Sequence, residues 1–154
     1  MNFLSRILIT IAAAVGLTTT ALAQDHGSRD DAKAMVDAAL AHVKKVGPEK
    51  AFEDFSKDKA AWTKKDLYVF AMDFDGVNKA HGANEKLIGK ALIGLKDQQG
   101  KEFVKEMVAV GSGKGEGWVD YDWANPVTKK VEGKSSYVKR IAGTSYLLAV
   151  GIYR

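Results

Sequence analysis

Residues 29–46 carry an apolar stripe with the three- and four-residue spacing of one face of an α-helix. Ser28 followed by Asp31 resembles a capping box in which aspartate replaces the usual glutamate, so the helix is predicted to begin after Ser28. Gly47-Pro48 is predicted to end it. The stripe needs a surface to pack against, and its members are Ala32, Met35, Val36, Ala39, Leu40, Val43 and Val46.

A second, shorter helix is predicted from Pro48, because proline suits the first turn of a helix. This helix would carry Phe52 and Phe55 on one side. Residues 56–65 are polar and rich in lysine around a single tryptophan, a pattern that favours an irregular connection.

The period changes to that of a β-strand at residue 66. Residues 67–72 are rich in β-branched and aromatic side chains, and Asp75-Gly76 is typical of a tight turn. Residues 77–81 would return as the second strand of a hairpin. A loop or short helical turn is predicted over residues 84–96, with apolar anchors at Leu87, Ile88, Leu92 and Leu95.

The last third of the chain predicts one more helix and three strands. Asp97 is expected to cap the helix, which the glycines of residues 111–115 would end. Its buried side would consist of Phe103, Val104, Met107 and Val108. The strands are predicted over residues 117–123, 135–141 and 146–153.

This order of elements predicts an α+β fold with one antiparallel sheet of about five strands. The long first helix is expected to cover one face of the sheet. The crossover from the hairpin to the last strands, with the middle helix, is expected to cover the other face. A pocket under that crossover is a natural place for a small ligand.

The first 23 residues have the organisation of a secretory signal peptide. Arg6 is the only charged side chain, an apolar run covers residues 7–17, and Ala21-Leu22-Ala23 forms an A-x-A end. The apolar run is shorter than the ~20 residues of a membrane span, although an uncleaved anchor is the alternative. We therefore expect a signal peptide over residues 1–23, one domain over residues 24–154, and a periplasmic location with no membrane span after cleavage.

Composition narrows the chemistry further. The chain has no cysteine and three scattered histidines, so a disulfide, a thiolate metal site or a histidine-rich zinc site is not expected. Its 23 lysines and arginines are interspersed with 19 acidic residues, for a net charge of +4. This mixture is typical of a soluble surface rather than a nucleic-acid groove. We expect no cofactor, no metal and no nucleic-acid partner.

Three parts of the sequence, taken together, resemble the single Cache domain family. The first is residues 68–76 with His81, and the second is residues 87–90 with residues 95–97. The most specific is the W-x-D-Y-x-W-x-x-P order of residues 118–126, followed by residues 134–138 and 151–153. The resemblance covers roughly residues 30–154.

The resemblance implies a PAS-like extracytoplasmic sensor that binds small molecules, often small carboxylates. Such domains usually lie between two membrane helices of a chemoreceptor or sensor kinase. Here a cleavable signal is predicted before the domain, and the sequence stops at Arg154. We therefore expect a stand-alone secreted form that signals through a membrane receptor or sensor kinase.

Strand alternation selects the first candidate ligand residues. Tyr121 and Trp123 share one face of their strand and offer flat apolar walls with polar tips, with plain core packing as the alternative. Lys134 is the candidate cation for a ligand carboxylate, or else a solvated lysine. Tyr137 is a further candidate for the same ligand. Strict alternation places it on the face opposite Lys134, Ser136 and Val138, but this rule does not apply to Lys134 if that residue precedes the regular strand.

The hairpin supplies three more candidates. Phe70 is expected to line the pocket, with core packing as an equal alternative. Asp73 is expected chiefly to bond the backbone of its turn, and secondarily to contact the pocket. His81 ends the second hairpin strand and is a candidate to bond a ligand oxygen, with a structural role as the alternative.

The leading hypothesis is a non-catalytic periplasmic protein that binds a small organic acid and acts in signal transduction or chemotaxis. The alternative is a protein-interaction module with a degenerate pocket, which would form a homodimer through its N-terminal helix. An enzyme is not expected, because no nucleophile or metal set is assembled by spacing. The sequence around Asp73 and Gly76 departs from a calcium loop in its glycine position.

Overall fold

The computed structural model describes residues 25–154, so the predicted signal peptide over residues 1–23 lies outside the described residues. Helix α1 (Arg29–Val46) begins with the predicted capping box. The Ser28 hydroxyl accepts a hydrogen bond from the backbone N–H of Asp31 at 3.1 Å, and the Asp31 carboxylate accepts one from the backbone N–H of Ser28 at 3.1 Å. The buried side of α1 belongs to the predicted stripe, with Ala32, Val36, Ala39 and Val43 at its centre.

Helix α2 (Pro48–Lys57) buries Phe52 and Phe55, as predicted. The irregular connection predicted over residues 56–65 is wrong in part. It contains the short helix α3 (Lys59–Trp62) and the two-residue strand β1 (Thr63–Lys64). Elements of four and two residues are too short to give a periodic pattern, so their existence depends on local caps and on pairing with the sheet.

All strand pairs are antiparallel, in the order β1-β2-β6-β5-β4, with β3 also paired to β2. The prediction of a five-stranded antiparallel sheet is confirmed, and β1 makes the sixth strand. Strand β5 begins four residues before the predicted start. The longer strands are β2 (Leu67–Asp73), β3 (Asn78–His81), β4 (Glu116–Ala124), β5 (Val131–Arg140) and β6 (Tyr146–Tyr153).

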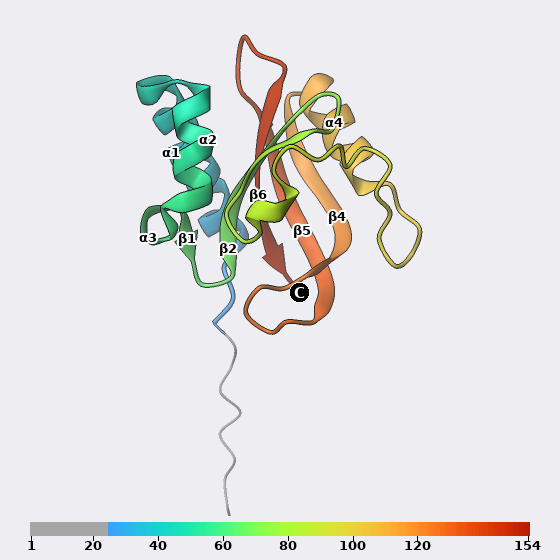
Figure 1. The fold of residues 1–154 in the computed structure, drawn as a ribbon. Helices are drawn as coiled ribbons and strands as arrows, with labels where there is room; N and C mark the ends of the chain where they lie inside the picture. The colour runs from blue at the N-terminus through green and yellow to red at the C-terminus, as the bar shows by residue number, and fades with distance from the viewer. Residues whose placement is uncertain (1–24) are drawn as a thin grey trace, which may run out of the picture.

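The two faces of the sheet are covered as the sequence predicts. Helices α1 and α2 pack on one face, and α4 (Phe103–Ser112) lies on the other with the long loop that arches from β3 to α4 (Figure 1). That loop contains the short 3-10 helix η1 (Glu85–Leu87). Each face has its own apolar cluster, and the cluster beneath α4 and the loop is the one that contains a cavity.

Asp97 does not cap α4, so that prediction is wrong. The helix begins at Phe103, with Glu102 at its N-cap position. The Asp97 carboxylate instead accepts hydrogen bonds from the backbone N–H groups of Gln99, Lys101 and Asp122. It therefore closes a turn and holds the long loop against β4, which fixes one wall of the cavity.

Candidate functional site

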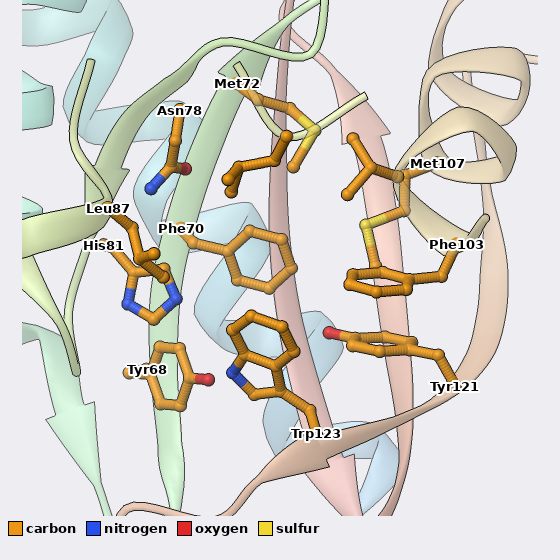
Figure 2. A pocket seen from close by; sticks show the side chains of 12 residues that line it. Tyr68, Phe70, Met72, Asn78, His81, Leu87, Phe103, Met107, Tyr121 and Trp123 are labelled. Carbon is orange, nitrogen blue, oxygen red and sulfur yellow. The ribbon is translucent and has the colours of Figure 1, made fainter. Parts of the chain in front are cut away.

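A cavity lies between the inner face of the sheet, α4 and the arching loop (Figure 2). Strands β2, β3 and β4 each contribute to its wall, and so do η1 and α4. The space open to the centre of a water molecule is about 20 Å³, so a ligand of only a few heavy atoms fits this conformation. Most of the wall is apolar, including Met72, Leu92, Phe103, Val104 and Met107.

The polar side chains at one end of the cavity come from three different strands. Tyr68 of β2, His81 of β3 and Trp123 of β4 all line this end. In Figure 2 the indole nitrogen of Trp123 and the hydroxyl of Tyr68 point toward one another, with the His81 ring beside them. The rings of Tyr68 and His81 lie 5.0 Å apart between centroids. The cavity therefore has a polar end and an apolar end.

The protonation state of His81 follows from its neighbours. Its Nδ1 accepts hydrogen bonds from the backbone N–H groups of Ala83 at 3.3 Å and Asn84 at 3.0 Å. Burial, followed by the nearby amines of Lys134 and Lys59, lowers the pKa of His81 to about 3. The ring is therefore neutral at physiological pH, and its proton is on Nε2. His81 offers an N–H donor to a ligand.

Lys134 is fully buried directly behind this polar end. Its Nζ donates a hydrogen bond to the Tyr68 hydroxyl at 2.6 Å and lies 4.0 Å from the centroid of the Tyr68 ring. The rings of Tyr153 and Phe70 are 4.9 and 5.4 Å from the same nitrogen. Lys134 does not itself line the cavity, so it acts on a bound group through Tyr68 or after a small movement of that ring.

The Lys134 amine forms no salt bridge with any carboxylate within residues 25–154. Burial therefore lowers its pKa well below the usual value for lysine. An amine in this position is a strong potential partner for an anion, because removing charge from water is costly unless an opposite charge is close by.

A chain of hydrogen bonds leads from Lys134 to the end of β4. The Tyr153 hydroxyl donates to the backbone carbonyl of Ala124 at 2.8 Å, and the Tyr68 and Tyr153 hydroxyls are 3.3 Å apart. Since the proton of Tyr153 is engaged with Ala124, Tyr68 must donate to Tyr153. The lone pairs of Tyr68 are then left for Lys134 and for one further donor.

Four of the predicted ligand residues come together at this cavity: Phe70, His81, Tyr121 and Trp123. Tyr121 stacks on Phe103 of α4, with the ring centroids 4.4 Å apart and the planes 5° from parallel. Its hydroxyl is 2.9 Å from the hydroxyl of Ser136, which fixes the ring in place. These contacts make Tyr121 a rigid wall.

The structure does not bring Asp73 and Tyr137 to the cavity. Asp73 accepts hydrogen bonds from the backbone of Asp75 and Val77 and pairs with Lys79 at 2.9 Å, which agrees with its predicted role in the turn. Tyr137 faces α1, and its hydroxyl donates to Glu116. The expectation that Tyr137 meets the same ligand as Lys134 does not hold, because successive residues of β5 alternate between the two faces.

Several lining residues were not predicted. Tyr68 shares a strand face with Phe70, so alternation could have identified it. Phe103 and Met107 were assigned to the core, which they also form. Asn78 lines the cavity through an irregularity in β3 that no residue pattern indicates.

A wider hollow of about 280 Å³ adjoins the polar end and forms its mouth. It shares Tyr68, His81 and Trp123 with the cavity. Its remaining wall comes from the loops after β3 and β4: Ala83, Asn84, Ala124, Asn125, Pro126 and Lys129. A ligand would therefore reach the polar end first.

No group of three or more histidine and acidic side chains among residues 25–154 is arranged to hold a metal ion. None of the helices in this range has the length and hydropathy needed to cross a membrane.

Known proteins with similar sequences include a sensor histidine kinase and a methyl-accepting chemotaxis protein. The sensor histidine kinase MctS of Rhizobium johnstonii is 29% identical over 89 residues, which are 58% of this chain and 19% of the kinase. The methyl-accepting chemotaxis protein McpP of Pseudomonas putida is 28% identical over 88 residues, which are 57% of this chain and 16% of the receptor. The matched part is therefore less than a fifth of either relative.

Solved structures give the same architecture. A methyl-accepting chemotaxis protein from Vibrio parahaemolyticus superposes with a TM-score of 0.68 at 25% identity, covering 80% of this chain and 86% of that one. A Cache chemosensory domain, solved to show the basis of carboxylic acid recognition, superposes with a TM-score of 0.69 at 23% identity, covering 80% and 91%. At 23% identity, the match to this Cache chemosensory domain shows only that the two folds are alike.

The sequence model of single Cache domain 2 matches residues 8–154, nearly the whole chain. This match agrees with the PAS-like arrangement of one antiparallel sheet between a long N-terminal helix and a crossover. The protein belongs to the single Cache domain 2 family.

Proposed function

We propose that this protein is a periplasmic sensor domain that binds a small carboxylate in the cavity beneath α4 and signals through a membrane partner. The observation that carries the proposal is the buried amine of Lys134, which lies behind the polar end without an anionic partner among the described residues. A carboxylate at that end would supply the missing charge.

The donors around the polar end suit a carboxylate. His81 offers its Nε2–H, and the indole N–H of Trp123, which points toward the Tyr68 hydroxyl, lies at the same end. Both donors are neutral, so the ligand's charge would be balanced chiefly by Lys134 through Tyr68. The approach of a carboxylate favours the charged form of Lys134, which strengthens its hydrogen bond to Tyr68.

The apolar end limits the size and polarity of the part of the ligand beyond its carboxylate. Met107, Phe103 and Leu92 surround it, and the cavity is small. A short alkyl group would bury its carbon atoms there, gaining about 0.8 kcal/mol per methylene. No second cation lines the cavity within the described residues, so a monocarboxylate is favoured over a dicarboxylate.

The comparisons support the signalling half of the proposal. The sequence relatives are a sensor kinase and a chemotaxis receptor, and one structural neighbour is described as a periplasmic sensor domain. The predicted signal peptide agrees with a periplasmic location. The ligand-bound protein would contact a receptor or sensor kinase, and it would perform no catalysis.

No feature of α1 favours the alternative of a dimer module with a degenerate pocket. The apolar side chains of α1 pack against the sheet, and its exposed face is mainly charged or small. The large apolar residues most exposed among residues 25–154 are Ile88, Val127 and Val131, and none of them belongs to α1.

The proposal is tested by isothermal titration of the purified protein with acetate, propionate and butyrate, alongside propanol and propionamide as uncharged analogues. We expect 1:1 binding of at least one acid and none of the uncharged analogues. Trp123→Phe removes the indole donor and should weaken the acid at least tenfold. Trp118→Phe is the matched control. Trp118 lies on the opposite face of β4, so its replacement should leave the affinity unchanged.

The proposed site would be rejected if Trp123→Phe and Trp118→Phe lost the same affinity for the acid. It would also be rejected if the protein bound propionate and propionamide equally tightly. A stable dimer in light scattering, with no response to any of the acids, would favour the protein-interaction alternative instead.

A further inference from the structure

The loop that joins β4 to β5 carries two exposed apolar side chains. It lies between the paired ends of the two strands, and Figure 1 shows it projecting from the end of the sheet. Val127 is 55% exposed, and Val131, the first residue of β5, is 49% exposed. Ile88 is the only other large apolar residue among residues 25–154 with comparable exposure. We call residues 126–131 the β4–β5 tip.

Two lysines lie between these valines. Lys129 and Lys130 are exposed, and no salt bridge joins either amine to a carboxylate in the part of the chain that the structure describes. Glu132 is the nearest acidic residue in the sequence, and both of its carboxylate oxygens are engaged. They accept hydrogen bonds from the Asn125 amide at 2.7 Å and from the Thr128 hydroxyl at 2.5 Å. The two amines of the tip are therefore available to an external anion.

Hydrogen bonds hold the tip in one shape. The backbone carbonyl of Asn125 accepts from the N–H of Lys129 at 2.9 Å, and the backbone N–H of Asn125 donates to the carbonyl of Lys130 at 2.8 Å. The side-chain oxygen of Asn125 also accepts from the backbone N–H of Val127 at 2.9 Å. A tip that is already ordered loses little conformational entropy when it meets a surface.

Lys129 occupies a position that suits glycine better. Its φ angle is 63°, in the left-handed region that residues with a side chain rarely adopt and that glycine adopts freely. The turn alone would therefore be more favourable with glycine. The amine of Lys129 is the part of this residue that the turn does not need, and it is exposed beside Val127 in the sequence.

The shape of the tip favours a lipid surface over a protein. A stable protein interface buries roughly 800 Å² on each partner, usually around an aromatic or arginine side chain. The tip projects and offers two valines, with no aromatic side chain in residues 126–131. A lipid surface needs no matching shape. Apolar side chains enter it, while lysine amines reach the headgroup phosphates.

We propose that the β4–β5 tip attaches this protein to a membrane surface that contains anionic phospholipids. The two valines enter the boundary between headgroups and acyl chains, and Lys129 and Lys130 lie among the phosphates. Two apolar side chains and two amines give weak, reversible attachment. The tip also contributes Pro126 and Lys129 to the mouth of the cavity, so attachment holds that mouth beside the membrane.

Sedimentation with vesicles tests the attachment. The protein is isolated after export, without the predicted signal peptide, because the apolar run of residues 7–17 would itself bind lipid. We expect the protein to sediment with vesicles of equal parts phosphatidylglycerol and phosphatidylcholine. The partition coefficient should be about tenfold lower for vesicles of phosphatidylcholine alone, which have no net charge to attract the lysines.

Lys129→Gly tests the contribution of the amine. It should lower the partition coefficient about fivefold, which is the factor expected for one lysine near an anionic surface. It should not lower the thermal stability, because glycine fits the left-handed turn. Lys114→Gly is the matched control. It removes the same charge from an exposed position before β4, at the end of the strand opposite the tip, and should leave the partition coefficient unchanged.

The valines are tested without a change of charge. The double variant Val127→Ser, Val131→Ser should lower the partition coefficient about tenfold. Ile88→Ser is its control, because it removes an exposed apolar side chain that lies outside the tip, and it should bind the vesicles as the wild-type protein does.

Three results would overturn the proposal. If the wild-type protein does not sediment with the phosphatidylglycerol vesicles, the membrane is not the partner of the tip. If Lys129→Gly and Lys114→Gly lose the same affinity, the tip is not the point of contact. If the double valine variant partitions like the wild-type protein, no side chain of the tip enters the lipid. The carboxylate site stands in each case, because it is tested by titration with acids.

Discussion

The side chain of Lys134 crosses β6 directly over Gly151. A Cβ atom on Gly151 would lie 2.2 Å from Cε of Lys134 and 2.3 Å from the Ser136 hydroxyl. The absence of a side chain at Gly151 is therefore what lets an amine from β5 pass over β6 and reach Tyr68 of β2. This close approach sets the position of the only cation behind the polar end among the described residues.

We predict that Gly151→Ala lowers the free energy of unfolding by about 1–3 kcal/mol, because the added methyl group overpacks this crossing. It should also weaken acid binding, since Lys134 must move. Urea denaturation and titration with propionate measure the two effects. Gly94→Ala is the control, because a Cβ there meets nothing within 4 Å, and it should leave both quantities nearly unchanged.

Lys134→Met should separate stability from function. Methionine keeps an unbranched apolar stem and removes the amine that burial disfavours, so we predict a higher free energy of unfolding, by about 1–4 kcal/mol. The same variant should lose carboxylate binding. Thermal unfolding with and without propionate tests both statements, and a destabilised variant that still binds propionate would contradict them.

Binding of a carboxylate should be accompanied by the uptake of a proton by Lys134. Burial holds the pKa of Lys134 well below its usual value in the free protein, and a bound carboxylate raises that pKa again. Between these two pKa values the free amine is neutral and the bound amine is charged. The affinity for propionate should therefore fall as pH rises through this window.

Titration in two buffers with different ionisation enthalpies measures that proton directly. We expect uptake that approaches one proton per ligand in the wild-type protein. Lys129→Met, which removes an amine at the mouth, should retain the uptake. Uptake that is zero at every pH at which propionate binds would show that Lys134 does not exchange a proton with the site.

The fold could be predicted from the sequence where periodicity extends over several turns or residues. Both α1 and β4 bury one side against the rest of the protein. Apolar residues therefore recur in the sequence with the period of the helix or of the strand. The predicted cap at Asp97 is wrong because an aspartate carboxylate accepts backbone N–H groups both at a helix N-terminus and in a tight turn. Gly100, at φ 81°, was the sequence signal for the turn.

Part of the site was predictable for the same reason. Alternation placed Tyr121 and Trp123 on the same face of their strand, and both contribute to the apolar cluster beneath α4. The depth of Lys134 was not predictable, because it depends on Gly151 in a different strand. The place of Asn78 in the cavity wall was not predictable either, because it depends on a bulge that shifts the pairing of β2 and β3.

His81 should make the protein sensitive to acid. Its pKa of about 3 in the folded protein lies below the 6.5 of an unperturbed histidine, so the unfolded chain binds more protons between these values. Stability should then fall as pH decreases from 6.5 to 3, by up to ~1.4 kcal/mol per pH unit from this group alone.

His81→Asn is the variant that isolates this effect. The asparagine oxygen can still accept from the backbone of Ala83 and Asn84, but it does not titrate. Urea denaturation at pH 7 and pH 4 should show a smaller acid loss in His81→Asn than in the wild-type protein. Equal losses would mean that His81 does not control acid stability.

The most direct measurement is a crystal structure of the protein grown with propionate. We expect a carboxylate at the polar end, with its oxygens within hydrogen-bonding distance of His81 Nε2 and Trp123 Nε1, and an alkyl chain directed toward Met107. A propionate with its carboxylate among the apolar side chains, or a cavity without propionate at saturating concentration, would contradict this expectation.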